Sequence, residues 1–483
     1  MAKNSEAVAE AGPGGVRCNL AYIWCISLVA ALGGLLFGYD WVVISGADLF
    51  YEKYFHLVSA SEVGWAKSCA LVGCLLGAVV SGGLSDRLGR KRLLLLSALL
   101  FTVSSIGTGL ASSYEAFVSW RIIGGVAIGL ASNLSPMYIA EIAPAHLRGR
   151  LVAVNQLTIV IGILGAQVVN WLIAVKIDHH GVDATAIEAA RQSWNNTYGW
   201  RWMFTAVTMP SLLFFVGSLF IPESPRWLVK NGKADQARGI LTRIGGAAQA
   251  EAAVRDIEST IGRDEVQRVR FTDLLEPKML KILLVGVTLA VLQQWSGINS
   301  IFNYAEEIYR SAGYGISDIM FNIVITGAIN LAFTLIAIGT VDHFGRRILM
   351  LIGCAGIGLS HVLIGIAYAL GLKGLSVLVF TLCALGCYGM SLAPICWVLI
   401  SEIFPNRHRA EGQALGSFTH WVFAALLTTF FPMMVSAFAP ASVFLFFCGM
   451  MVLQLIWVKT MVPETKGVAL EAMQHALGID ADP

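Results

Sequence analysis

The sequence is short of charge. Only 13% of its 483 residues are Asp, Glu, Lys or Arg, whereas 56% are hydrophobic. A soluble globular domain carries about 25% charged residues, so this deficit points to a lipid bilayer rather than water as the solvent. The net charge of +2 also gives no basic excess for binding nucleic acid.

Several chemical signatures are missing as well. The nine cysteines are scattered through apolar runs without metal-ligand spacing, and we expect them to act as small packing residues. No GxxxxGK[ST] motif occurs, which argues against direct use of ATP. The polar segments hold no nucleophile–base set. We therefore expect no cofactor, no bound metal and no enzymatic activity.

Long apolar runs dominate the chain instead. A helix needs about 20 mostly apolar residues to cross a bilayer. Twelve segments meet this condition: 20–46, 65–85, 93–111, 117–140, 151–175, 202–221, 280–308, 318–341, 348–371, 374–400, 411–436 and 441–462. Because the polar N-terminus lacks the pattern of a cleaved signal peptide, we take the first run as a spanning helix.

Lys and Arg gather in the even-numbered connections between these runs. They lie in DRLGRKR (86–92), HLRGR (146–150), FGRR (344–347), NRHR (406–409) and the polar segment 222–281. Since basic residues stay on the cytoplasmic side of a membrane, both termini are expected there. Within 222–281, two stretches have apolar residues at helical spacing, which predicts short amphipathic helices under the bundle. A disordered linker is the alternative.

The two sides of this linker repeat each other. DRLGRK (86–91) corresponds to DHFGRR (342–347), the pattern E-x-x-P-x-x-x-R occurs at 141–148 and 402–409, and PES (222–224) corresponds to PET (463–465). The order is the same in both, which indicates a duplicated six-helix unit. Such halves around a midplane site are typical of transporters. The expected parts are a tail (1–19), a first half (20–221), a linker (222–279), a second half (280–462) and a tail (463–483).

The motifs also resemble a known family. GGLSDRLGRKR, PESPRWL, QQWSGIN, SEIFP and PETKG are similar to motifs of the sugar porter family of the major facilitator superfamily. The similarity extends from the first apolar run to PETKG. It implies the major facilitator fold and a monomeric, proton-coupled monosaccharide importer of a bacterial inner membrane. Alternating access is the implied mechanism, with xylose or glucose as the leading substrates.

Two other functions share this pattern. A facilitative uniporter would have the same fold and pocket without proton coupling. A sugar sensor would bind without transport, although sensors of this superfamily tend to carry long extensions and only sixteen residues follow PETKG here.

Three amides stand in the middle of the apolar run 280–308. Gln293, Gln294 and Asn299 are costly in lipid without partners, and amides suit sugar hydroxyls because they both donate and accept hydrogen bonds. Ser296 and Gly297 between them would let the helix bend or break. Hydrogen bonds between helices are the alternative explanation.

The resemblance implies further pocket residues. It assigns sugar binding to Gln156, Gln293, Gln294, Asn299 and Asn330, and pocket aromatics to Trp397 and Trp421. Phe37 and Tyr39 are expected walls of the pocket because they lie near Asp40 in the sequence. Three positions depart from common family patterns: Ile163 and His420 replace Gln, and Asn303 replaces Tyr. These departures leave the identity of the sugar open.

Asp40 lies within the apolar stretch LLFGYDWVVIS (35–45). A charge at membrane depth costs about 2.5–3.5 kcal/mol, so this carboxylate is expected to be protonated, paired or in contact with water. Arg121, in VSWRIIGG, is its natural partner. A carboxylate that alternates between a proton and Arg121 could couple transport to protons. A permanent bridge between two helices is the alternative.

The resemblance favours coupling. Proton-coupled members of the family have Asp at this position, and facilitative relatives have Asn. Val207, however, stands where some proton-coupled members have Glu, so a second acid is missing from this helix.

Charged residues of the repeated motifs form a separate group. In the family they bridge the two halves when the cavity faces outward and separate when it opens inward. The resemblance implies this gating role, in one cluster, for Asp86, Arg87, Arg90, Glu141, Arg148, Glu223, Arg226, Asp342, Arg346, Arg347, Glu402 and Arg409.

Overall fold

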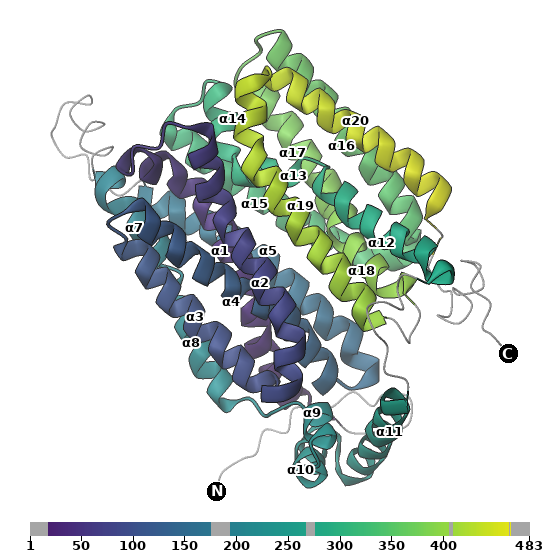
Figure 1. Ribbon diagram of the computed structural model, residues 1–483. Helices are drawn as coiled ribbons and strands as arrows, with labels where there is room; N and C mark the ends of the chain where they lie inside the picture. The colour runs from purple at the N-terminus through teal and green to yellow at the C-terminus, as the bar shows by residue number, and fades with distance from the viewer. Residues whose placement is uncertain (1–17, 175–193, 267–275, 405–408, 463, 465–483) are drawn as a thin grey trace, which may run out of the picture.

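The computed structural model of the protein describes residues 18–174, 194–266, 276–404, 409–462 and 464. These residues form helices and their connections, and no strand occurs among them. Twelve of the helical segments are long and apolar enough to cross a membrane, which confirms the predicted all-α fold. Figure 1 shows them as a bundle with the first half of the chain in purple and blue and the second in green and yellow.

The first half contains six spans. Five are single helices, and the sixth consists of three consecutive segments. They are α1 (Leu20–Tyr54), α2 (Ala60–Leu88), α3 (Arg90–Leu110), α4 (Tyr114–Ile142), α5 (Ala145–Ala174), and η1 (Asn195–Gly199) with α7 (Trp200–Thr205) and α8 (Thr208–Phe220).

The second half also contains six spans, of which the seventh and tenth are broken. They are α12 (Pro277–Gln294) with α13 (Ile298–Asn303), α15 (Ile316–Phe344), α16 (Arg346–Ala369), α17 (Leu375–Met390) with α18 (Leu392–Ile403), α19 (Arg409–Ala437) and α20 (Pro440–Met461). A short helix, α14 (Ala305–Ser311), follows the seventh span and lies outside it.

In the described part of the linker, three short helices join the halves: α9 (Pro225–Lys230), α10 (Ala234–Gly245) and α11 (Ala247–Val266). The last two fall on the two stretches for which the periodicity predicts helices. All three lie together at one end of the bundle, which we call the linker end (Figure 1). The first span begins at this end, next to α10. The backbone N–H of Asn19 donates to the carbonyl oxygen of Ile244 at 2.8 Å. The opposite, far end holds the end of α1, the start of α2 and α14.

Two predicted spans were too short at one end. The first span continues past residue 46 to Tyr54, and the sixth begins at Asn195 rather than at 202. The extension of α1 includes Asp48, which is fully buried, so apolarity alone could not reveal that the helix continues.

Glycines bring helices of the first half into close contact. A Cβ added to Gly73 would collide with the carbonyl oxygen of Ile122, and one added to Gly125 would collide with that of Ala70. α2 and α4 therefore pack backbone against backbone. Gly73 and Gly77 have the small-xxx-small spacing that permits such close approach of helices.

The repeat is visible in how two helices begin. Glu223 accepts hydrogen bonds from the backbone N–H groups of Arg90 at 2.9 Å and Lys91 at 3.1 Å, at the start of α3. Glu464 does the same for Arg346 at 2.9 Å and Arg347 at 3.1 Å, at the start of α16. A carboxylate satisfies the free N–H groups and the positive end of the helix dipole.

Candidate functional site

The polar run of the seventh span lies at a break in the helix. α12 ends at Gln294 and α13 begins at Ile298. Gly297 between them has φ +76°, in the left-handed region that favours glycine. Nε2 of His361 lies 2.7 Å from the carbonyl oxygen of Ser296 and satisfies one backbone group that the break leaves open. The predicted break is confirmed.

The amides at this break form a hydrogen-bonded chain. Asn299 donates to the side-chain oxygen of Gln294, and Gln294 donates to that of Gln293 at 2.6 Å. Gln293 in turn donates to the hydroxyl of Tyr388 at 2.8 Å. The amide nitrogen of Gln294 also lies 2.9 Å from Nδ1 of His420. The chain thus joins three broken or neighbouring spans, the seventh, tenth and eleventh.

Aromatic rings lie beside these amides, between the two halves. Trp421 of α19 is 1% exposed, and its ring centroid is 5.7 Å from those of both Phe37 and Trp41 of α1. His420 lies edge-on to Trp421, at 5.6 Å. A ring face from the second half therefore packs against the first half at mid-depth.

The other predicted pocket residues lie on neighbouring helices. Asn330 is buried in α15, and a Cβ added to Gly389 of α17 would lie 3.1 Å from its side-chain oxygen. Asn303 donates to the hydroxyl of Thr428 at 3.4 Å. Gln156 is half-buried in α5.

Two further positions complete the comparison with the expected pocket. Ile163 of α5 packs against the apolar core of the second half, so it lies between the halves. Trp397 lies in α18, but its side chain is outside the described part of the structure.

Asp40 and Arg121 form the predicted pair. Nη1 of Arg121 donates to Oδ1 of Asp40 at 2.9 Å, and Nη2 donates to the carbonyl oxygen of Asp40 at 3.3 Å. Both side chains are buried, and the guanidinium lies 5.3 Å from the ring centroid of Phe204. Among the described residues, Oδ2 of Asp40 and Nε of Arg121 have no hydrogen-bond partner. The pair is therefore only partly satisfied.

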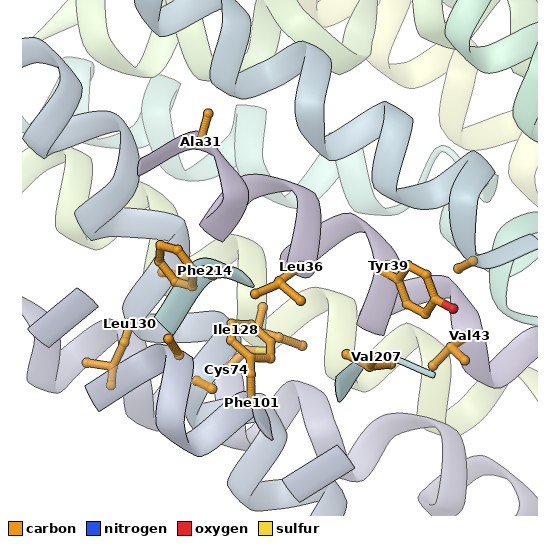
Figure 2. Close-up of a cluster of buried hydrophobic side chains, with 14 of the residues drawn as sticks. Ala31, Leu36, Tyr39, Val43, Cys74, Phe101, Ile128, Leu130, Val207 and Phe214 are labelled. Atoms are coloured by element: carbon orange, nitrogen blue, oxygen red, sulfur yellow. The ribbon is translucent and has the colours of Figure 1, made fainter. Parts of the chain in front are cut away.

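Val207 provides no second acid. Its side chain is fully buried in the apolar core of the first half. Figure 2 shows this cluster, to which Val43 and Phe101 also belong. Asp40 therefore has no acidic neighbour at this position.

The motif charges of the first half gather at the linker end. Arg90 donates to both carboxylate oxygens of Glu141, at 3.0 and 2.9 Å, and to Asp86 at 3.2 Å. Ser224 donates to Glu141 at 2.5 Å, and Lys230 donates to Asp86 at 2.8 Å. These bonds attach α9 to α2 and α4.

The other predicted gating residues divide into three groups. Arg346 and Arg347 contact Glu464 through their backbone, within the second half. Arg87, Arg148 and Arg226 are exposed. The side chains of Asp342, Glu402 and Arg409 lie outside the described part of the structure. The hydrogen bonds named here join residues of the first half and the linker, or residues of the second half. The gathering of the whole set in one cluster stays a prediction.

Sequence reasoning missed two residues of the central region. Trp41 follows Asp40 directly and was taken as part of an apolar run, although it packs on Trp421. Tyr388 is the partner of Gln293. Its hydroxyl within the apolar run 374–400 was the available signal.

Twelve spans in two equivalent halves, with polar side chains gathered at mid-depth between them, define a secondary transporter. A family model described as "Sugar (and other) transporter" matches residues 26–477. The chain therefore belongs to this sugar transporter family.

Individual relatives cover nearly the whole chain. A D-xylose-proton symporter of Escherichia coli (strain K12) is 37% identical, over 94% of this chain and 96% of its own. A glucose transport protein of Synechocystis is also 37% identical, over 96% and 99%. A solved structure of the xylose transporter XylE from E. coli, partially occluded and inward open, matches with a TM-score of 0.81 at 36% identity, covering 93% of this chain and 100% of that one.

Proposed function

We propose that the protein is a proton-coupled importer of a monosaccharide, with xylose or glucose as its substrate. The chain of amides at the break of the seventh span, beside the ring of Trp421, carries this proposal. Amides offer donors and acceptors to sugar hydroxyls, and an aromatic face suits the apolar side of a sugar ring. The names of the relatives, a xylose-proton symporter and a glucose transport protein, support the same substrate class.

The proposed sugar site lies between the halves. Gln293, Gln294, Asn299 and Asn330 supply hydrogen bonds from the second half, and Gln156 supplies one from the first. The ring stacks on Trp421, with Phe37 behind it. His420 contacts Gln294, and Asn303 lies one helical segment beyond the amides, so both influence which sugar fits. Trp397 is assigned to the wall by family resemblance alone.

Asp40 carries the proton in this proposal. Its free Oδ2 can accept a proton, which removes the charge that attracts Arg121. Each protonation state favours one arrangement of α1 and α4, so proton uptake and release drive the halves to rock around the bound sugar.

We place the linker end in the cytoplasm of a bacterial cell, because the basic connections lie at that end. Contacts between the halves occur toward the far end. Thr429 donates to Ser68 at 2.7 Å, and the rings of Trp171 and Phe321 lie 5.9 Å apart. In this proposal these contacts shut the outer end, and the structure corresponds to an inward-facing state.

The test uses purified protein in sealed liposomes. An inward proton gradient is imposed, and uptake of labelled xylose and glucose is followed with and without a protonophore. We expect accumulation above equilibrium that the protonophore abolishes. Equilibration without accumulation would identify a uniporter, and saturable binding without uptake would identify a sensor. An absence of both binding and uptake would exclude these two sugars.

A further inference from the structure

A buried lysine at the far end joins charges of the first half. Lys67 lies in the second turn of α2, and its side chain is 0% exposed. Its Nζ is 2.8 Å from Oδ2 of Asp48, which is also fully buried, and 3.6 Å from Oε1 of Glu52. Both carboxylates belong to α1, so Lys67 holds the far ends of α1 and α2 together.

The same ammonium group also contacts the second half. It donates a hydrogen bond to Oε1 of Glu307 in α14 and lies 4.1 Å from the ring centroid of Tyr304. Tyr304 is held in turn, because its hydroxyl donates to the carbonyl oxygen of Thr428 at 2.5 Å. One cation is thus shared between the two halves.

Acidic groups outnumber basic groups around this lysine. Glu306 is 2% exposed and lies 3.4 Å from Arg310. The set therefore opposes the carboxylates Asp48, Glu52, Glu306 and Glu307 to the cations Lys67 and Arg310. Buried carboxylates without a cation repel one another and lose their hydration, so this contact between the halves depends on Lys67.

The cluster lies beside a hollow that is open at the surface. The hollow of about 400 Å³ is lined by Glu52, Lys53, His56 and Arg310, among others. The side chains of Glu52 and Glu307 are 20% and 27% exposed. When the halves part at this end, Glu306 and Glu307 can therefore hydrate, while Asp48 remains paired with Lys67.

We propose that Lys67 is a positioning residue of the transport cycle, an electrostatic latch that holds the outer end shut while the inner end is open. The latch rests on the proposed function for its sidedness and its place in a cycle. It acts by binding Asp48 of the first half and Glu307 of the second at once. Opening toward the outside requires the bond to Glu307 and the contact with Tyr304 to break.

The latch is tested by measuring the opening itself, without sugar. Nitroxide side chains are placed at Val58 and Lys373, exposed positions at the far ends of the two halves, as unnatural amino acids so that the native cysteines remain. Electron–electron distance measurements on the full-length protein then report whether the far end is shut. The label pair is combined with Lys67→Met, Lys67→Arg, Glu307→Gln and Lys53→Met.

We expect Lys67→Met to raise the ratio of open to shut molecules more than about tenfold, because it leaves buried carboxylates unpaired. Glu307→Gln should open the outer end less, and Lys67→Arg should restore part of the shut population. Lys53 is exposed, and no ion pair is described for it, so Lys53→Met is the matched control and should resemble the wild type.

A wild-type distance distribution in folded Lys67→Met would overturn the proposal. If that variant does not fold, the decision passes to Glu307→Gln and Lys67→Arg. The proposal would also be overturned if the outer end stayed shut in Lys67→Arg and Glu307→Gln gave the same distance distribution as the wild type. Because no sugar is used, this experiment can refute the latch without refuting sugar transport, and the transport assay can refute sugar transport without refuting the latch.

Discussion

Arg121 binds only one of the two carboxylate oxygens of Asp40. Nη1 lies 2.9 Å from Oδ1, whereas Oδ2 is buried without a hydrogen-bond partner among the described residues. A carboxyl group can therefore take a proton on Oδ2 without first displacing the guanidinium from Oδ1. The proton would weaken the pair by removing its charge, and α1 would become free to move relative to α4.

Asp40→Asn should uncouple transport from protons. The amide oxygen of Asn can still accept from Arg121, but the side chain cannot take up a proton. We expect loss of accumulation under a proton gradient, while exchange of labelled for unlabelled sugar persists. The measurement is uptake and counterflow in proteoliposomes.

Asp318→Asn is the matched control, because Asp318 is an exposed acid in the first turn of α15. It should accumulate sugar as the wild type does. Accumulation by Asp40→Asn would assign Asp40 a purely structural role as the partner of Arg121.

Gln294→Ala should weaken sugar binding. Gln294 is the centre of the amide chain, with Gln293, Asn299 and His420 as its neighbours. Each lost hydrogen bond to the sugar costs about 0.5–1.5 kcal/mol, so removal of two should raise the Kd by roughly 5- to 150-fold. Isothermal titration calorimetry with the transported sugar measures this change.

The control for this variant is Asn133→Ala. Asn133 donates to Ser81 at 2.9 Å between α2 and α4, away from the amide chain. Its loss should lower stability but leave the Kd unchanged. Equal affinities for Gln294→Ala and the wild type would mean that the amides serve helix packing alone.

The spans and the central amides could be predicted because each differs in polarity from the residues next to it in the sequence. A run of about 20 apolar residues is visible without knowledge of partners, and so is a pair of glutamines inside one. The break at Gly297 follows from its neighbours in the same way. Each of these features can be recognised from neighbouring residues in the sequence, without knowledge of the tertiary structure.

The partners of these residues could not be predicted, because they are set by tertiary packing. Nothing in the sequence connects Gln293 to Tyr388, or Lys67 to Glu307, which lies 240 residues away. The predicted first span ended at residue 46, before the charged residue Asp48. Lys67 neutralises it, and the helix continues.

Gly125→Ala should destabilise the first half. The added Cβ would collide with the carbonyl oxygen of Ala70, a backbone atom that cannot rotate away. Overpacking of this kind typically costs about 1–3 kcal/mol, so the melting temperature in detergent should fall. Gly82→Ala in α2 is the matched control, because a Cβ there meets nothing within 4 Å. Equal melting of both variants would argue against backbone contact between α2 and α4.

Glu306 should make opening of the outer end depend on pH. It lies beyond the seventh span, and burial, together with the nearby carboxylate of Glu307, raises its pKa from 4.5 to about 8. When the outer end opens, Glu306 hydrates and its pKa returns toward the ordinary value. The charged groups that interact with it are Asp48, Glu52, Lys67, Glu307 and Arg310. His56 lines the neighbouring hollow together with Glu52 and Arg310.

The shut state therefore binds a proton that the open state releases. This stabilisation is fully present below about pH 4.5 and is lost as the pH rises through about 8. The ratio of open to shut molecules should rise with pH in this window, by at most about tenfold per unit for one proton. The distance between labels at Val58 and Lys373 measures this, at equal pH on both sides.

Glu306→Gln should flatten the pH profile and keep the outer end shut at high pH, because the amide imitates the protonated acid. Glu115→Gln is the matched control, since Glu115 is an exposed acid in the first turn of α4 at the same end. It should follow the wild-type profile. If Glu306→Gln keeps the wild-type slope, Glu306 does not bind the proton that links the opening of the outer end to pH.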